Sequence, residues 1–226
     1  MKKIKQILAV TLVMVLVAVA SIGITVAFLT DKDSKANIFT LGNVDIALHE
    51  DFEQGSMLMP GKKIVKKPTI ENTGINDAWV WATVAIPAEL DDSDDASKNI
   101  IHFNFSSESV AAGQWTWTDP SGNWMIKENV DIDGVKYNVY TVMYQTALTP
   151  GDTTDYPVIH QVYMDDHVDI DADGNMFWVS NGASTAINWN VKNQTAPTIH
   201  VAAYAIQKEG FSNVWDAYAA YQDQWN

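Results

Sequence analysis

Apolar and polar residues alternate along most of the chain, and this two-residue period constrains the fold more than any other sequence feature. The pattern begins at Val44, Ile46 and Leu48, and the segment 79–86 is apolar on both of its faces. Other segments with the same period are 134–144, 156–164, 177–180, 185–191 and 198–207. This period is typical of β-strands, and a strand that is apolar on both faces is typical of a sheet's centre. The sequence therefore predicts an all-β protein with 79–86 as a central strand.

Short segments rich in Gly, Pro, Asn and Asp separate the predicted strands. They are found at 60–63, 72–74, 119–123, 131–134, 149–152 and 180–182. These residue types favour tight turns, because Gly and Asn tolerate positive φ and Asp accepts hydrogen bonds from nearby amides. We expect about eight to ten strands in two packed antiparallel sheets, which is a jelly-roll-like antiparallel β-sandwich.

Two segments depart from the two-residue period. The acidic segment 89–99 predicts an exposed loop that contains a short helix. Near the C-terminus, apolar residues recur at helical spacing at Val214, Tyr218, Tyr221 and Trp225. Ser212 is placed to cap this helix, and Asp216 lies in its first turn. The sequence thus predicts a short C-terminal helix whose apolar face packs on a sheet.

The N-terminus has the pattern of an export signal. A basic start with three lysines precedes an apolar segment, and small residues at Thr25 and Ala27 favour cleavage between Ala27 and Phe28. We expect residues 1–27 to be a helical signal peptide that is removed. The alternative is a retained membrane anchor, because the apolar segment 4–29 is long enough to span a bilayer. The membrane is expected as a partner only through the uncleaved signal.

The composition is acidic and lacks cysteine. Three of the 14 lysines lie in the signal, so the 28 acidic residues leave the mature chain a formal charge of about −17. Nucleic-acid binding depends on basic groups that neutralise phosphates, so this charge argues against a nucleic-acid partner. With no cysteine, disulfides and thiol catalysis are excluded.

Four segments resemble the TasA and camelysin family of exported biofilm matrix proteins of Gram-positive bacteria. "TVAFLTDKDSKANIFTLGNVDI" (25–46) is similar to the family's processing boundary, where a small-residue cleavage site runs into a strand. "MPGKKIVKKPTIENTG" (59–74) resembles the next element, a Pro-Gly turn and a strand that ends in Asn-x-Gly. "TPGDTTDYPVIHQVYM" (149–164) and "IHVAAYAIQKEGF" (199–211) resemble a later turn with its strand and the closing strand.

The resemblance implies a function in the extracellular matrix. Family members are cleaved by a signal peptidase of the SipW type, adopt a jelly-roll domain and assemble into fibres, with the N-terminal segment of one subunit completing a sheet of the next. It implies that residues 28–41 are a donor strand and residues 42–226 the β-sandwich domain. The donor residues would be Phe28, Leu29, Ile38, Phe39 and Leu41. Other copies of the chain and a minor matrix or anchor protein are the expected partners.

One segment has the spacing of a calcium-binding loop. Asp169, Asp171 and Asp173 precede Gly174 in the Asp-x-Asp-x-Asp-Gly order, in which alternate oxygens converge on the ion. The twelfth position of that pattern is Ser180 rather than a bidentate acid. A bound calcium ion and a solvated turn therefore remain as alternatives, and no cofactor is required.

Catalytic patterns are absent from the sequence. The five histidines include no His-Glu-x-x-His zinc motif, and no Gly-x-Ser-x-Gly nucleophile motif is present. A secreted metallopeptidase is the less favoured alternative, and we expect no enzyme activity. Trp115, Trp117 and Trp124 flank a predicted turn and suggest a second alternative, a carbohydrate- or protein-binding module at the cell surface.

Overall fold

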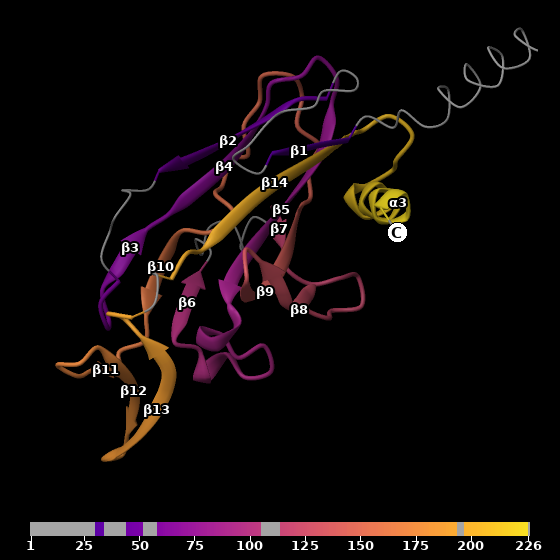
Figure 1. Cartoon of the computed structure of the whole chain (residues 1–226). Coiled ribbons are helices and arrows are strands. Elements are labelled where there is room, and N and C mark those ends of the chain that lie inside the picture. Colours follow the sequence, from indigo (N-terminus) through magenta and orange to yellow (C-terminus); the bar gives the residue numbers. More distant parts are fainter. Residues whose placement is uncertain (1–29, 34–43, 52–57, 105–113, 194–196, 226) are drawn as a thin grey trace, which may run out of the picture.

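The computed structural model describes residues 30–33, 44–51, 58–104, 114–193 and 197–225. These ranges contain fourteen strands, two short 3₁₀ helices and one α-helix (Figure 1). The strands are β1 (Thr30–Asp33), β2 (Ile46–Asp51), β3 (Lys63–Val65), β4 (Lys67–Asn72), β5 (Ala78–Pro87), β6 (Ile101–Asn104), β7 (Trp115–Thr116), β8 (Ile126–Ile132), β9 (Val135–Tyr144), β10 (Gln161–Met164), β11 (Val168–Ile170), β12 (Asn175–Ser180), β13 (Ala183–Asn190) and β14 (His200–Gln207). The helices are η1 (Ala88–Leu90), η2 (Ala96–Lys98) and α3 (Val214–Trp225).

The strands form one large sheet and three small ones. The large sheet has the order β1-β14-β5-β9-β7, and β8 pairs with β9 as its sixth strand. The small sheets are β3-β10-β6, β11-β12-β13 and β2-β4. All strand pairs in these sheets are antiparallel. The predicted antiparallel all-β fold with a C-terminal helix is therefore confirmed for the described residues.

Strand β5 lies at the centre of the large sheet and is buried on both faces. One face is completely buried, at 0% exposure for each of Val80, Ala82, Val84 and Ile86. These side chains belong to the main core, which also contains Ile70. β5 pairs with β14 on one side and with β9 on the other. The prediction of a central strand at 79–86 is confirmed, because only a strand covered from both directions can bury such a run.

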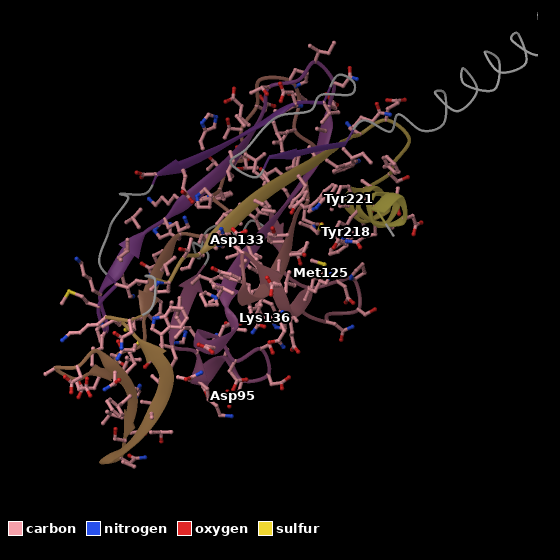
Figure 2. The ribbon with its side chains drawn as sticks, viewed as in Figure 1. Asp95, Met125, Asp133, Lys136, Tyr218 and Tyr221 are labelled. Carbon is pink, nitrogen blue, oxygen red and sulfur yellow. The ribbon has the colours of Figure 1, made fainter. Side chains whose placement is uncertain are left out.

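The opposite face of β5 forms a second core beneath helix α3. Trp81 is 1% exposed, and its ring centroid lies 5.5 Å from that of Tyr218 and 5.0 Å from that of Tyr221. Figure 2 shows both tyrosines on the helix, and Met125 packs against the same core. Burial raises the pKa of Tyr221 to about 12. The predicted docking of the helix on a sheet is confirmed.

The helix N-cap differs from the prediction. Asn213, not Ser212, caps the helix, because its Oδ1 accepts hydrogen bonds from the backbone amides of Trp215 at 2.9 Å and Asp216 at 3.0 Å. Both residue types are good N-caps, and the two positions are adjacent. The sequence could not choose between them, since the packing of Val214 sets where the first turn begins.

Segment 156–164 is also less regular than predicted. Only Gln161–Met164 forms a strand, whereas Val158 and Ile159 are adjacent and both buried. The backbone amide of Val158 donates to the oxygen of Pro68, and the oxygen of His160 accepts from the amide of Lys66. The chain therefore crosses the junction of β3 and β4 without forming a ladder. The acidic segment 89–99 contains η2 and most of η1, so the predicted short helix is present. The segment is less exposed than predicted, because Leu90, Asp91 and Asn99 are buried.

Asn72 fixes the end of β4 by hydrogen bonds made inside the core. Its side chain is fully buried, and Nδ2 donates to the oxygens of Asn76 at 2.8 Å and Leu148 at 2.9 Å. Its Oδ1 accepts from the amide of Gly74 at 3.0 Å. A single amide thus joins the β4–β5 turn to the segment that follows β9.

We predict that Asn72→Ala destabilises the fold by about 2 to 4 kcal/mol, because a buried side chain loses three hydrogen bonds, although the oxygen of Leu148 still accepts from the amide of Ala78. Urea unfolding followed by tryptophan fluorescence measures this change. Asn123→Ala removes an exposed amide from a surface turn and is the matched control, for which a much smaller loss is expected. Equal losses in the two variants would contradict the role given to Asn72.

No helix among the described residues is long and apolar enough to cross a membrane. The predicted signal peptide, residues 1–27, lies outside the described residues.

Candidate functional site

Part of the predicted donor strand forms an edge of the large sheet. Residues Thr30–Asp33 form β1, which pairs antiparallel with β14, so that Thr30 lies opposite Ile206 and Asp33 opposite Ala203. The donor side chains Phe28, Leu29, Ile38, Phe39 and Leu41 lie outside the described residues, as does the cleavage site at Ala27 and Phe28. β1 and β14 belong to the same chain, so this edge is closed within one molecule.

Strand β14 is longer than the strand that covers it. β5 pairs with all of His200–Gln207 on one side, whereas β1 pairs only with residues from Ala203 to Ile206 on the other. Among the described strands, none pairs with the outer side of 200–202. The outer edge of β14 is therefore about half covered by β1.

The predicted calcium loop is a β-turn between β11 and β12. The Asp171 carboxylate accepts from the amides of Asp173 at 2.9 Å and Asn175 at 2.8 Å, and from the Asn175 side chain at 2.9 Å. These hydrogen bonds, first those of Asn175, lower the pKa of Asp171. Asp169 lies in β11, where its Oδ1 accepts from the amide of Ile170.

The same turn occurs where no calcium spacing exists. Asp119 accepts from the amides of Ser121 at 2.8 Å and Asn123 at 2.9 Å, and from the Asn123 side chain at 3.1 Å. Both turns have the sequence Asp-x-x-Gly-Asn, with Gly122 and Gly174 at φ +87°. The turn at 171–175 therefore has an explanation in hydrogen bonding alone. Lys192 also donates to the oxygen of Ala172 in this turn.

A different group of ligating atoms converges nearby. Asp165, Asp166 and His167 form the one group of three such side chains within 4.8 Å among the described residues. The Asp165 carboxylate also contacts His102 Nε2 at 2.8 Å and His167 Nδ1 at 2.8 Å. Burial alone would raise the pKa of Asp165, but hydrogen bonds from His167 and His102 lower it. The three residues of the calcium spacing are not brought together with this group.

The histidines do not form the site of a metallopeptidase among the described residues. His49 contacts Glu71 at 2.6 Å, and His200 contacts the hydroxyl of Tyr137 at 3.2 Å. His167 stacks on Trp178 with 5.1 Å between ring centroids. Each of these three rings thus has a neighbour that accounts for its position, and His102 and His167 share the carboxylate of Asp165.

A polar cleft that the sequence did not predict lies beside η1. Its volume is about 490 Å³, and its charged lining residues are Glu89, Asp91, Asp92, Lys98 and Glu128. Residues 186–188 of β13 form another part of the lining. The partners of these residues are distant in sequence, which is why no motif revealed the cleft.

Asp91 is the most buried acid of this cleft. It is 6% exposed, and its Oδ2 accepts from Asn138 Nδ2 at 2.9 Å and from the Tyr140 hydroxyl at 2.7 Å. Its Oδ1 is buried and has no hydrogen-bond partner in the described part of the chain. Burial raises the pKa of Asp91, although the hydrogen bonds from Asn138 and Tyr140 oppose this rise.

The three tryptophans proposed as a sugar platform do not form one surface. Trp115 and Trp117 are each 5% exposed and belong to the main core, whereas Trp124 is 56% exposed. Trp115 also donates from its ring nitrogen to the oxygen of Tyr156. Only Trp124 presents its ring to solvent. Trp115 and Trp117 pack inside the core, so the three rings do not line one binding face.

Comparisons of the chain with protein-family models, with curated proteins and with solved structures gave no match. The TasA and camelysin resemblance therefore rests on the sequence segments alone, and what it implies enters the next subsection as a proposal.

We predict that the turn at 171–175 does not depend on calcium. Asp171→Ala and Asp119→Ala should lower the melting temperature by similar amounts, because each removes the same three hydrogen bonds. Adding millimolar calcium should leave the melting temperature of the unmodified chain unchanged in scanning calorimetry. A rise with calcium that disappears in Asp171→Ala but not in Asp119→Ala would establish an ion site.

The stability conferred by Asp91 should depend on pH. A carboxyl whose folded pKa is raised favours folding fully below its unfolded pKa of about 4, and this contribution is lost as pH rises through the folded pKa. Asp91→Asn retains an oxygen for Asn138 and Tyr140 and carries no charge. We predict that the melting temperature of Asp91→Asn, relative to that of the unmodified chain, increases as the pH rises from 4 to 8. The same gain in Asp173→Asn, an exposed control, would contradict a role of burial.

Proposed function

We propose that this protein is an exported structural protein of the extracellular matrix that assembles into fibres by N-terminal donor-strand exchange. The observation that carries the proposal is the position of β1, since the segment behind the expected cleavage site supplies the outermost strand of the large sheet. An edge strand at a chain terminus leaves without breaking any other strand pair. A neighbouring copy has the same strand to offer in its place.

The short pairing of β1 supports such an exchange energetically. Four residue pairs correspond to about four backbone hydrogen bonds, and each contributes about 0.5 to 1.5 kcal/mol net. The closed pairing is thus worth about 2 to 6 kcal/mol, which thermal motion opens readily. A longer segment that also buries apolar donor residues gains about 8 to 18 kcal/mol, against an association cost of about 4 to 15 kcal/mol.

The formal charge of the mature chain sets the conditions for assembly. At about −17, copies repel one another, and salt, divalent cations or lower pH weaken the repulsion. In this proposal, assembly follows cleavage by a signal peptidase of the SipW type, because the donor segment is tethered to the membrane until then. A minor matrix or anchor protein would attach the fibre to the cell.

We propose further that the domain is a jelly-roll-like sandwich. Ile46 of β2, Ile70 of β4 and Val162 of β10 belong to the same buried cluster as the inner face of β5. These strands come from small sheets that pack against the large one, which is the layer arrangement of a sandwich.

Electron microscopy of the mature chain tests the proposal. Residues 28–226 should form filaments when the charge is screened, whereas residues 42–226 should stay monomeric. Ile38→Asp with Phe39→Asp should also block filaments, because the charges prevent burial of two donor residues. The matched control, Ser34→Asp with Asn37→Asp, adds the same charge at polar positions and should assemble. Monodisperse monomers of residues 28–226 in all conditions, or filaments of residues 42–226, would refute the proposal.

Cysteine crosslinking tests the exchange itself, because the chain has no cysteine of its own. Asp33 lies opposite Ala203 in the closed pairing. A mixture of Asp33→Cys chains and Ala203→Cys chains should give a disulfide-linked pair only if β1 of one copy occupies β14 of another. Ser121→Cys in place of Ala203→Cys is the control and should give no such pair. Filaments without the crosslink would mean assembly by another contact.

A further inference from the structure

Strand β13 has an open outer edge. The amide of Val179 donates to the oxygen of His167, so Val179 faces β11, and its neighbours Ser180 and Trp178 face β13. Their partners in the register are Ala183 and Thr185. Because successive residues of a regular strand point their backbone groups in opposite directions, Ser184 and Ala186 direct theirs away from β12. The register shift between Asn175 and Met176 leaves residues 188 and 189 in a bulge, where this alternation does not hold. No backbone hydrogen bond joins Ser184 or Ala186 to another element of the described residues.

The other long edges of the described sheets are protected. β8 carries several charges and a register shift between Lys127 and Val130, and β2 ends in His-Glu-Asp. β13 runs for 8 residues, Ala-Ser-Thr-Ala-Ile-Asn-Trp-Asn, without a charge or a proline. Charges, prolines and bulges are the usual means by which an edge avoids pairing. β13 has a register shift opposite Asn175 and Met176 and contacts η1, so its regular and exposed part, residues 183–186, is the part that is free to accept another strand.

The open edge leads into the acidic cleft. Residues 186–188 line the cleft, and Asn188 Nδ2 donates to Glu89 Oε1 at 3.0 Å across it. Lys98, the one basic lining residue, is bound to Asp95 at 3.0 Å. Four carboxyl groups thus line the cleft together with a single lysine, and the buried Oδ1 of Asp91 has no hydrogen-bond partner among the described residues. The charge of the cleft favours a cationic group.

We propose that β13 and this cleft bind an extended peptide segment of a partner protein, which pairs with residues 184–186 and places a lysine side chain in the cleft. The segment would add an antiparallel strand to the β11-β12-β13 sheet, a common mode of peptide recognition. Backbone pairing supplies affinity for any extended chain. The carboxylates of Glu89, Asp92 and Glu128 make a basic side chain bind more tightly than a neutral or acidic one.

Charge argues against a second copy of this chain as the occupant. Pairing of β13 with β13 would bring two acidic clefts together on chains that are each strongly negative, and like charges oppose such a contact. This site is separate from the β1–β14 edge and does not rest on fibre assembly. Removing residues 28–41 should leave it unchanged.

A seven-residue peptide with blocked ends, Thr-Val-Thr-Lys-Thr-Val-Thr, tests the proposal by titration calorimetry with the mature chain, residues 28–226. It should bind about 10- to 100-fold more tightly than the same peptide with glutamate in place of lysine, since a charge-assisted hydrogen bond is lost. Asp92→Asn with Glu128→Gln should reduce this preference to near unity. Asp173→Asn with Asp216→Asn removes the same charge outside the cleft lining and should leave it intact.

The pairing needs a second measurement. Ala186→Pro removes an outward amide and should abolish binding of the lysine peptide, whereas Ala186→Ser should retain it. Hydrogen exchange of the unmodified chain should show protection at Ser184 and Ala186 when the peptide binds, a readout that does not depend on the proline variant folding. Equal binding of the two peptides, or binding without this protection, would overturn the proposal, as would dimers of residues 42–226 formed through β13.

Discussion

Burial of β5 on both faces is the constraint on which the rest of the structure depends. One face places Val80, Ala82 and Val84 in the main core, and the other places Trp79 and Trp81 in a second core. A strand of this kind is stable only if separate elements cover each side, because either face alone would expose a large apolar area to water. The small sheets cover one face, and helix α3 covers the other. The C-terminal helix is thus a structural requirement of β5.

Polar anchors determine how the loops join these layers. Asn72 holds two loops together from inside the core, and Gly74 contacts both its side chain and the oxygen of Asp45. These residues are the Asn-x-Gly of the segment that resembles the TasA and camelysin family. Their presence has a physical cause in this chain, since Asn alone has both the donor and the acceptor in the required arrangement. In this chain the Asn-x-Gly motif is therefore explained by folding rather than by binding.

The sequence predicted what depends on local pattern and missed what depends on distant partners. The two-residue period located β5 and β14, and the helical spacing of Tyr218 and Tyr221 located the buried face of α3. The cleft was invisible because Asp91 meets Asn138 and Tyr140 only through folding. The calcium spacing at 169–173 left two alternatives open in the sequence, and the hydrogen bonds of Asp171 now give the turn an explanation that requires no ion. Trp115 and Trp117 likewise gave no local signal that separates core from surface.

If β1 exchanges between copies as proposed, the distribution of charge over the sheet edges favours that exchange. β1 has three charged residues among its four, so it suits an edge that faces water. If β1 leaves, the outer edge of β14 is exposed, and none of its eight residues is a lysine, a glutamate or an aspartate. Such an edge pairs with another strand much more readily than the charged β1 does. Closed and exchanged states contain the same β1–β14 pairing, so their free energies differ mainly by the entropy of association and by the contacts of the connecting segment. Screening of the charge between copies then shifts the balance, because it changes the exchanged state alone.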